Sequence, residues 1–112
     1  MKLIDPAALA ERRAALRCDL CRRTTPGGCE PHHYIRKGMA GGQRLDHRLN
    51  LLSACGTCHR SIHGGDVPRH TELDAIARRE KMYADEIAEW LWTVQRLPRG
   101  SALPPEPGMV EA

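Results

Sequence analysis

Two groups of metal-binding residue types lie within one 46-residue stretch of the chain. The first group is a pair of C-x2-C motifs separated by 33 residues, formed by Cys18, Cys21, Cys55 and Cys58. Each motif turns two sulfurs toward one side of a tetrahedral ion, and a set of four thiolates favours zinc. The sequence therefore predicts a structural zinc site that is closed by its four cysteines.

The second group consists of four histidines. His32 and His33 are adjacent, whereas His59 and His63 follow Cys58 at positions i and i+4, which share one face of a helix. Neighbouring residues on a strand point to opposite faces, so we expect His32 and His33 to have different roles. Three imidazoles around one ion with open positions form a catalytic arrangement, and an uncoordinated histidine suits a general base.

One cysteine and two histidines remain outside these two groups. Cys29 stands outside the C-x2-C pairs, and we expect a small buried residue there or a replacement for an assigned zinc ligand. His47 and His70 are expected to be surface or loop residues. A zinc ribbon that only binds nucleic acid or protein would account for the four paired cysteines, but it leaves the four clustered histidines unexplained.

The composition indicates one small domain. The chain has 112 residues, no Phe, two Trp and two Tyr, so its apolar core is small and a structural metal would help to stabilise it. The five cysteines, the lack of a signal-peptide pattern and the lack of a long apolar run favour a reducing, cytoplasmic location with no membrane contact.

The charge is distributed unevenly along the chain. Residues 1–70 carry 12 Lys or Arg against 6 Asp or Glu, whereas residues 71–112 carry 5 against 8. The part of the chain that holds the two motif groups is therefore basic, and a basic surface suits a polyanionic partner. A glycine-rich loop with two basic residues, residues 36–43, is expected to approach that ligand.

The segments around the motifs predict a small α+β domain over residues 1–97, with a core at 18–65 and a helical part at 71–97. Expected elements are a helix over 6–17, a strand over 29–35, and a brief second strand or extended segment at 51–52. A helix that ends before Gly64 follows, and then a helix that starts with a capping box at Thr71 and breaks near 82–85. Residues 98–112 are rich in proline and glycine, which is typical of a linker-like or disordered tail.

Three segments together carry a resemblance to a known family. They are Glu30-Pro31-His32-His33, Asn50-Leu51 and the run from Cys55 to His63, Cys-Gly-Thr-Cys-His-Arg-Ser-Ile-His. In this order and spacing the chain resembles the HNH endonuclease family, in its cysteine-containing branch, over some 40 per cent of its length. The resemblance implies a ββα-metal core (the HNH or His-Me finger fold), here flanked by N-terminal and C-terminal helices.

The resemblance also implies roles for individual residues. His32, His59 and His63 would bind a catalytic divalent metal, which could be Mg²⁺, Mn²⁺, Ni²⁺ or Zn²⁺, and His33 would be the general base that activates water.

Two further positions match the family pattern. Asn50 would fasten the loop between the strands and orient His33, although in branches with a carboxylate in place of His32 it helps to bind the metal. Glu30 would be the hydrogen-bond partner of a metal-bound imidazole. Arg60 either contacts phosphate or is an exposed surface residue.

The activity implied is hydrolysis of DNA phosphodiester bonds, by nicking or double-strand cleavage, on double-stranded DNA that is contacted mainly through its backbone phosphates. Two alternatives stay open: a catalytically inactive zinc-ribbon module that binds nucleic acid, and a subunit of a phage packaging or restriction assembly. In the second case Trp90 and Trp92 could form a docking face for a protein partner such as a packaging motor. Small proteins of this kind are typical of phages and bacteria.

Overall fold

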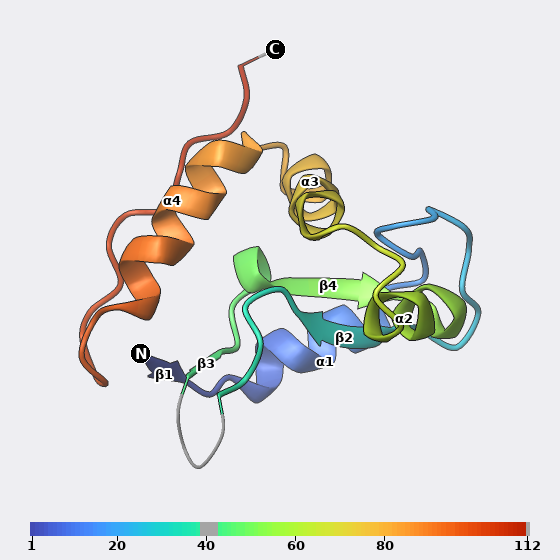
Figure 1. Ribbon diagram of the computed structural model, residues 1–112, viewed down its shortest axis with the longest axis horizontal. Helices are drawn as coiled ribbons and strands as arrows, with labels where there is room; N and C mark the ends of the chain where they lie inside the picture. The colour runs from blue at the N-terminus through green and yellow to red at the C-terminus, as the bar shows by residue number, and fades with distance from the viewer. Residues whose placement is uncertain (39–42, 112) are drawn as a thin grey trace.

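An antiparallel pair of strands lies at the centre of the fold (Figure 1). In this pair, β2 (Glu30–His33) runs beside β4 (Leu51–Ala54), with His32 opposite Leu52 and His33 opposite Leu51. The helices α1 (Pro6–Ala14) and α2 (Gly56–His63) both pack against the two strands. The computed structural model describes residues 1–38 and 43–111, so residues 39–42 of the predicted glycine-rich loop lie outside the described part.

The predicted α+β class is confirmed: the described residues form four α-helices, one 3₁₀ helix and two short sheets. The second sheet, which the sequence does not predict, pairs β1 (Lys2–Leu3) in parallel with β3 (Arg44–Leu45). The 3₁₀ helix η1 (Arg48–Asn50) leads directly into β4, and every residue of β4 is buried. None of the helices in the described residues is long and apolar enough to cross a membrane.

The first helix begins as predicted and ends earlier than predicted. The side chain of Asp5 accepts hydrogen bonds from the backbone N–H groups of Ala7 and Ala8, which caps α1. Instead of continuing to residue 17, the chain becomes extended at Ala15, and the carbonyl of Leu16 accepts from Thr25. The helix ends here because the chain folds back on itself to form the turn that carries the first cysteine pair.

The predicted helical segment near the C-terminus is indeed broken into two, α3 (Arg69–Glu80) and α4 (Ala84–Gln95), with Lys81 in a left-handed conformation at the break. The capping box predicted at Thr71 is wrong, because α3 already begins at Arg69 after Pro68 and has no side-chain cap. Glu72, which would have been the first helical residue after that cap, is instead fully buried.

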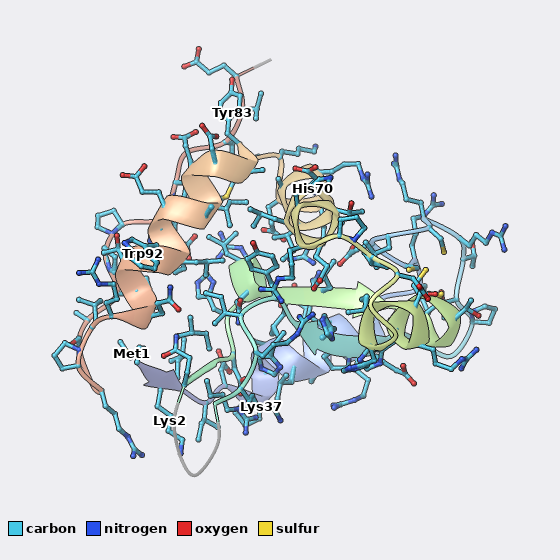
Figure 2. The ribbon with its side chains drawn as sticks, viewed as in Figure 1. Met1, Lys2, Lys37, His70, Tyr83 and Trp92 are labelled. Carbon is cyan, nitrogen blue, oxygen red and sulfur yellow. The ribbon has the colours of Figure 1, made fainter. Side chains whose placement is uncertain are left out.

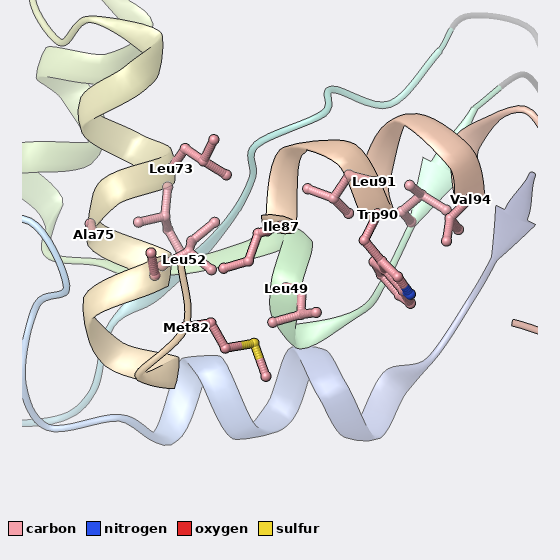
Figure 3. Close-up of a cluster of buried hydrophobic side chains, with 12 residues drawn as sticks. Leu49, Leu52, Leu73, Ala75, Met82, Ile87, Trp90, Leu91 and Val94 are labelled. Carbon is pink, nitrogen blue, oxygen red and sulfur yellow. The ribbon is translucent and has the colours of Figure 1, made fainter. Parts of the chain in front are cut away.

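The apolar core lies where α3 and α4 meet η1 and β4, as Figure 3 shows. Its labelled members are Leu49, Leu52, Leu73, Ala75, Met82, Ile87, Trp90, Leu91 and Val94. Trp90 is therefore a core residue, whereas Trp92 is 58% exposed. This core holds α3 against the β2–β4 pair, and α3 in turn brings the buried Glu72 to the strands.

The sequence predicts a linker-like or disordered tail, but the structure describes residues 98–111 as an extended segment with defined contacts. The indole Nε1 of Trp90 donates to the carbonyl of Pro104 (3.3 Å). The carboxylate of Glu106 pairs with Arg48 and lies 2.9 Å from Nε2 of His47. These contacts, and a backbone bridge between Met82 and Met109, place the segment alongside α4 (Figure 1).

Candidate functional site

The four paired cysteines come together between the loop after α1 and the start of α2. Cys18 and Cys21 lie in the loop, Cys55 is the N-cap residue of α2, and Cys58 is in its first turn. Their sulfurs all lie within 4.8 Å of one another, and the Sγ atoms of Cys21 and Cys55 are 3.9 Å apart. Tetrahedral zinc with Zn–S bonds of about 2.3 Å requires sulfurs about 3.8 Å apart. The four cysteines are therefore close enough to bind a metal such as zinc.

The thiol acidities in this cluster differ strongly. Burial opposes ionisation of Cys18, but hydrogen bonds from the backbone N–H groups of Cys55, Cys21 and Leu20 outweigh it and lower the pKa of Cys18 to about 7. Burial, together with the neighbouring thiols, raises the pKa of Cys58 well above its usual range. The first thiolate forms readily, and its negative charge makes ionisation of the neighbouring thiols less favourable. A divalent cation at the centre would remove this repulsion between thiolates.

The fifth cysteine lies outside this cluster. Cys29 is buried and is not among the metal-ligand groups of the described residues. Its backbone N–H donates to the carbonyl of Arg13, and burial raises the pKa of its thiol. Cys29 thus has the small buried character that the sequence predicts, and the ligand set needs no replacement.

Three histidines form a second cluster where β2 faces α2. His32 comes from the strand and His59 and His63 from the helix, and one ring nitrogen from each lies within 4.8 Å of the others. The Nε2 atoms of His59 and His63 are 3.0 Å apart, and the ring of His32 lies 5.2 and 5.4 Å from these two rings. The i, i+4 spacing on α2 thus presents two imidazoles to a third from the strand.

Two carboxylates contact ring nitrogens of this cluster at hydrogen-bond distance. Oε2 of Glu30 lies 2.6 Å from Nδ1 of His59, and Oε1 of Glu72 lies 3.1 Å from Nε2 of His32. A carboxylate only accepts, so Nδ1 of His59 donates to Glu30 and Nε2 of His59 keeps its lone pair. Nε2 of His32 lies between Oε1 of Glu72 and Nη1 of Arg36, which is 2.5 Å away and can only donate. Metal-binding histidines in proteins are usually oriented by such a carboxylate partner. The three imidazoles therefore fit a divalent metal.

Glu72 connects this cluster to α3. It is fully buried, and Oε1 accepts a hydrogen bond from Nη1 of Arg36 (3.0 Å) as well as contacting His32. Burial opposes the charge on Glu72, but the hydrogen bonds with His32 and Arg36 hold its pKa below the usual range. Burial also lowers the pKa of His32, which favours the neutral form that binds metals.

His33 follows His32 on β2 but takes a different partner. Its Nε2 lies 2.7 Å from Oδ1 of Asp46, a fully buried carboxylate. Asp46 also pairs with Arg44 (2.9 Å) and accepts the backbone N–H of Asp5 (3.0 Å). Burial opposes its charge, but these three partners lower the pKa of Asp46, so it is ionised and fixes the orientation of His33.

Asn50 is fully buried between the ends of two strands. Its Oδ1 accepts from the N–H of Ile35 (2.7 Å), and its Nδ2 donates to the carbonyls of Ile35 (3.2 Å) and Leu45 (3.0 Å). Asn50 therefore fastens the chain after β2 to β3. Among the described residues its side chain makes no hydrogen bond to the imidazole of His33, which is held by Asp46 instead.

The three clustered histidines and His33 line one cavity of about 580 Å³, here called the histidine cavity. It has four basic lining residues: Arg13, Arg36, Lys37 and Arg44. In Figure 2 Lys37 lies near α1, whereas His70 projects from α3, exposed and apart from the cavity. His47 is also apart from it, packed 4.8 Å from the ring of Trp90. The cavity thus combines a metal-binding set, an oriented histidine and positive charge.

Glu72 and Asp46 are the functional candidates that the sequence does not predict. Glu72 does leave a signal, because it shares a helix face with Ala75 and Ile76, which are both buried. A carboxylate on an apolar face needs a buried partner. Asp46 leaves no comparable signal, since its neighbours in sequence do not distinguish it from an exposed loop aspartate.

Comparisons of this chain with protein-family models, with curated proteins and with solved structures gave no match.

The two ligand clusters predict two metal ions per chain that differ in how firmly they are held. Metal analysis of the purified protein should find both, and dialysis against a low concentration of EDTA should remove only the one at the histidines, because four thiolates enclose the other. The His63→Ala variant should contain only the firmly held ion. A single ion in folded wild-type protein, unchanged in His63→Ala, would contradict the histidine site.

Proposed function

We propose that this chain is a metal-dependent endonuclease of the HNH type that hydrolyses phosphodiester bonds in DNA. The observation that carries the proposal is the histidine cavity, in which His32, His59 and His63 converge while the adjacent His33 is held separately by Asp46. The succession of β2, β4 and α2 along the chain and in space supports a ββα-metal core.

His33 has the chemistry of a general base in this arrangement. Asp46 is ionised and accepts the proton on Nε2, so the second ring nitrogen, Nδ1, keeps the lone pair that can take a proton from water. The imidazolium that forms is stabilised by the negative charge of Asp46, in the same way that a carboxylate supports histidine in other hydrolases. Asp46 would therefore act as a positioning residue.

His32, His59 and His63 would hold the divalent metal. When bound, that metal supplies Lewis-acid stabilisation of the negative charge that develops on the phosphoryl and leaving oxygens. Glu30 and Glu72 keep two of these imidazoles oriented, His59 through its Nδ1 and His32 through its Nε2. Their contribution is to preorganise the site before the substrate arrives.

The basic residues around the cavity would position the DNA. These basic residues are Arg13 from α1, Arg36 and Lys37 from the segment after β2, and Arg44 from β3. Phosphate contacts of this kind fix the nucleic acid in place without reading its sequence, and therefore weak sequence preference is expected. A partner protein, such as a packaging motor or a restriction system, would be needed for strong selectivity.

Plasmid nicking tests this proposal directly. The wild-type protein, stripped of its labile metal and then supplied with Mg²⁺, Mn²⁺, Ni²⁺ or Zn²⁺, should convert supercoiled plasmid to open-circular or linear DNA. His63→Ala, which keeps the four cysteines, should convert it far more slowly with every metal because one of three metal ligands is lost. Plasmid binding without conversion by the wild type, under all four metals, would favour the inactive zinc-ribbon module.

A further inference from the structure

A second basic cavity lies between α1, the loop after it, and α3. It has a volume of about 350 Å³ and shares no lining residue with the histidine cavity. Half of its ten lining residues are arginines, contributed by all three segments, and we call it the arginine cavity: Arg12, Arg17, Arg22, Arg78 and Arg79. These guanidinium groups can donate to acceptors in or around the hollow, and the acceptors that the described residues of the protein itself supply are few.

Among the described residues that line the arginine cavity, Asp19 is the only acidic one. Its carboxylate already has partners in the protein. Its Oδ2 lies 2.6 Å from Nη1 of Arg79 and accepts the backbone N–H of Ser53 at 2.7 Å. Arg79 is also paired with Glu80 at 2.7 Å. The charge of Asp19 therefore compensates Arg79 and leaves the other arginines of the cavity without a carboxylate from this residue.

Three of the remaining arginines are exposed and carry uncompensated charge. Within the described residues, Arg17 and Arg22 have no ion pair, and Arg78 donates only to the backbone carbonyl of Asp19. They come from different parts of the chain, with Arg17 and Arg22 on either side of the first cysteine pair and Arg78 on α3. Holding three such charges around one cavity raises its positive potential, which favours the entry of an anion.

Arg12 adds an independent sign that an acceptor is missing. The residue is only 9% exposed, and its Nη2 pairs with Glu11 at 3.1 Å. Its Nε is buried and meets no hydrogen-bond acceptor among the described residues. A buried N–H group without an acceptor is destabilising, and nearly all such groups in folded proteins have a partner.

We propose that the arginine cavity binds a phosphate group. Guanidinium groups donate in a planar fork that matches the oxygens of phosphate, and the net charge of the cavity favours an anion with more than one negative charge. The phosphate could belong to a nucleic-acid backbone or to a free phosphate ion, since both present the same oxygens. The site is independent of the proposed nuclease chemistry, because it uses none of the residues of the histidine cavity.

The Nε–H signal of Arg12 in a ¹⁵N-labelled, zinc-loaded full chain reports on a residue that lines this cavity and not the histidine cavity, and its loss in Arg12→Lys assigns it. Titration with inorganic phosphate should shift this signal to saturation, whereas chloride at equal ionic strength should not. In the Arg17→Ala/Arg22→Ala double variant, the apparent Kd should rise about tenfold, because charge-assisted hydrogen bonds are lost. Arg78→Ala, which changes no residue of the cysteine turn and, among the described residues, removes only the hydrogen bond to the carbonyl of Asp19, should weaken binding in the same direction.

Lys37→Ala provides the matched control, since Lys37 is a basic residue of the histidine cavity. The proposal is overturned if the Arg12 signal does not saturate, or if Lys37→Ala weakens the response as much as the double variant does. A short DNA duplex, added without divalent catalytic metal, distinguishes the two sources of phosphate. A saturating shift with the duplex that free phosphate competes away assigns the site to a nucleic-acid backbone, and a shift with free phosphate alone assigns it to the ion.

Discussion

The His33→Ala variant is expected to cut plasmid DNA at least about 100-fold more slowly than the wild type, the lower end of what general-base catalysis contributes. The side chain is mostly buried on β2 and contacts Asp46, but it lies outside the three-histidine cluster. Its removal should therefore leave both metal ions, the circular dichroism spectrum and the affinity for DNA close to those of the wild type. Nicking rates, measured with the metal that best supports the wild type, give the comparison.

His70→Ala is the matched control for this experiment. It removes an imidazole from the exposed face of α3, apart from the histidine cavity, and should cut at the wild-type rate. Equal cutting by His33→Ala and His70→Ala would remove His33 as the base. A His33→Ala protein that loses its metal would instead assign His33 a structural role at the cluster.

The Cys55→Ser variant is expected to lose most of its stability. Binding of zinc to structural sites contributes on the order of 10 kcal/mol in small metal-dependent domains, which is comparable with the total stability of about 5–15 kcal/mol of an ordinary domain. Cys55 supplies one sulfur and also caps α2, where its Sγ accepts the N–H of Cys58 at 3.4 Å. Thermal melting by circular dichroism, with zinc present, should show a greatly lowered Tm or no cooperative transition.

Cys29→Ser makes the same chemical change at a buried cysteine outside the cluster. It should keep one firmly bound zinc per chain and melt much closer to the wild type. If Cys55→Ser melts as the wild type does, the four-cysteine site is wrongly assigned. If Cys29→Ser loses its zinc and Cys55→Ser does not, Cys29 is a ligand in place of Cys55.

The parts of the site that the sequence predicts are those that depend on local geometry. A C-x2-C turn and an i, i+4 histidine pair place their side chains together within one turn of chain, so that Cys55, Cys58, His59 and His63 are recognisable from spacing alone. The alternation of side chains along a strand likewise predicts that His32 and His33 take different partners, which are Glu72 and Asp46.

The parts that the sequence does not predict depend on how distant segments pack. Glu72 lies 40 residues from His32, and only the packing of α3 on β4 and η1 brings the two together. The pattern around Thr71 resembles a helix start, but Pro68 sets the start earlier. The buried carboxylate of Glu72 is fixed by Arg36 and by the buried His32. Tertiary contacts of this kind override local propensity, and a single sequence carries little information about them.

The tail illustrates the same limit in another way. Its proline and glycine content is typical of a disordered segment, yet Glu106 meets two basic groups, Arg48 and His47, that come from η1 and its N-cap. The composition of a segment indicates how much apolar surface that segment can bury by itself. It does not indicate which charged partners the rest of the fold supplies.

The position of the two cysteine pairs along the chain has a consequence for the order in which the molecule assembles. Cys21 and Cys55 are 34 residues apart in sequence, and β2, η1 and β4 all lie between them. A metal ion that joins these cysteines closes this long segment into a ring and removes much of the chain entropy that opposes the pairing of β2 with β4. Zinc supply would then control when, and not only whether, the four histidines meet, and under the proposed function it would also set when a newly made chain can first cut DNA.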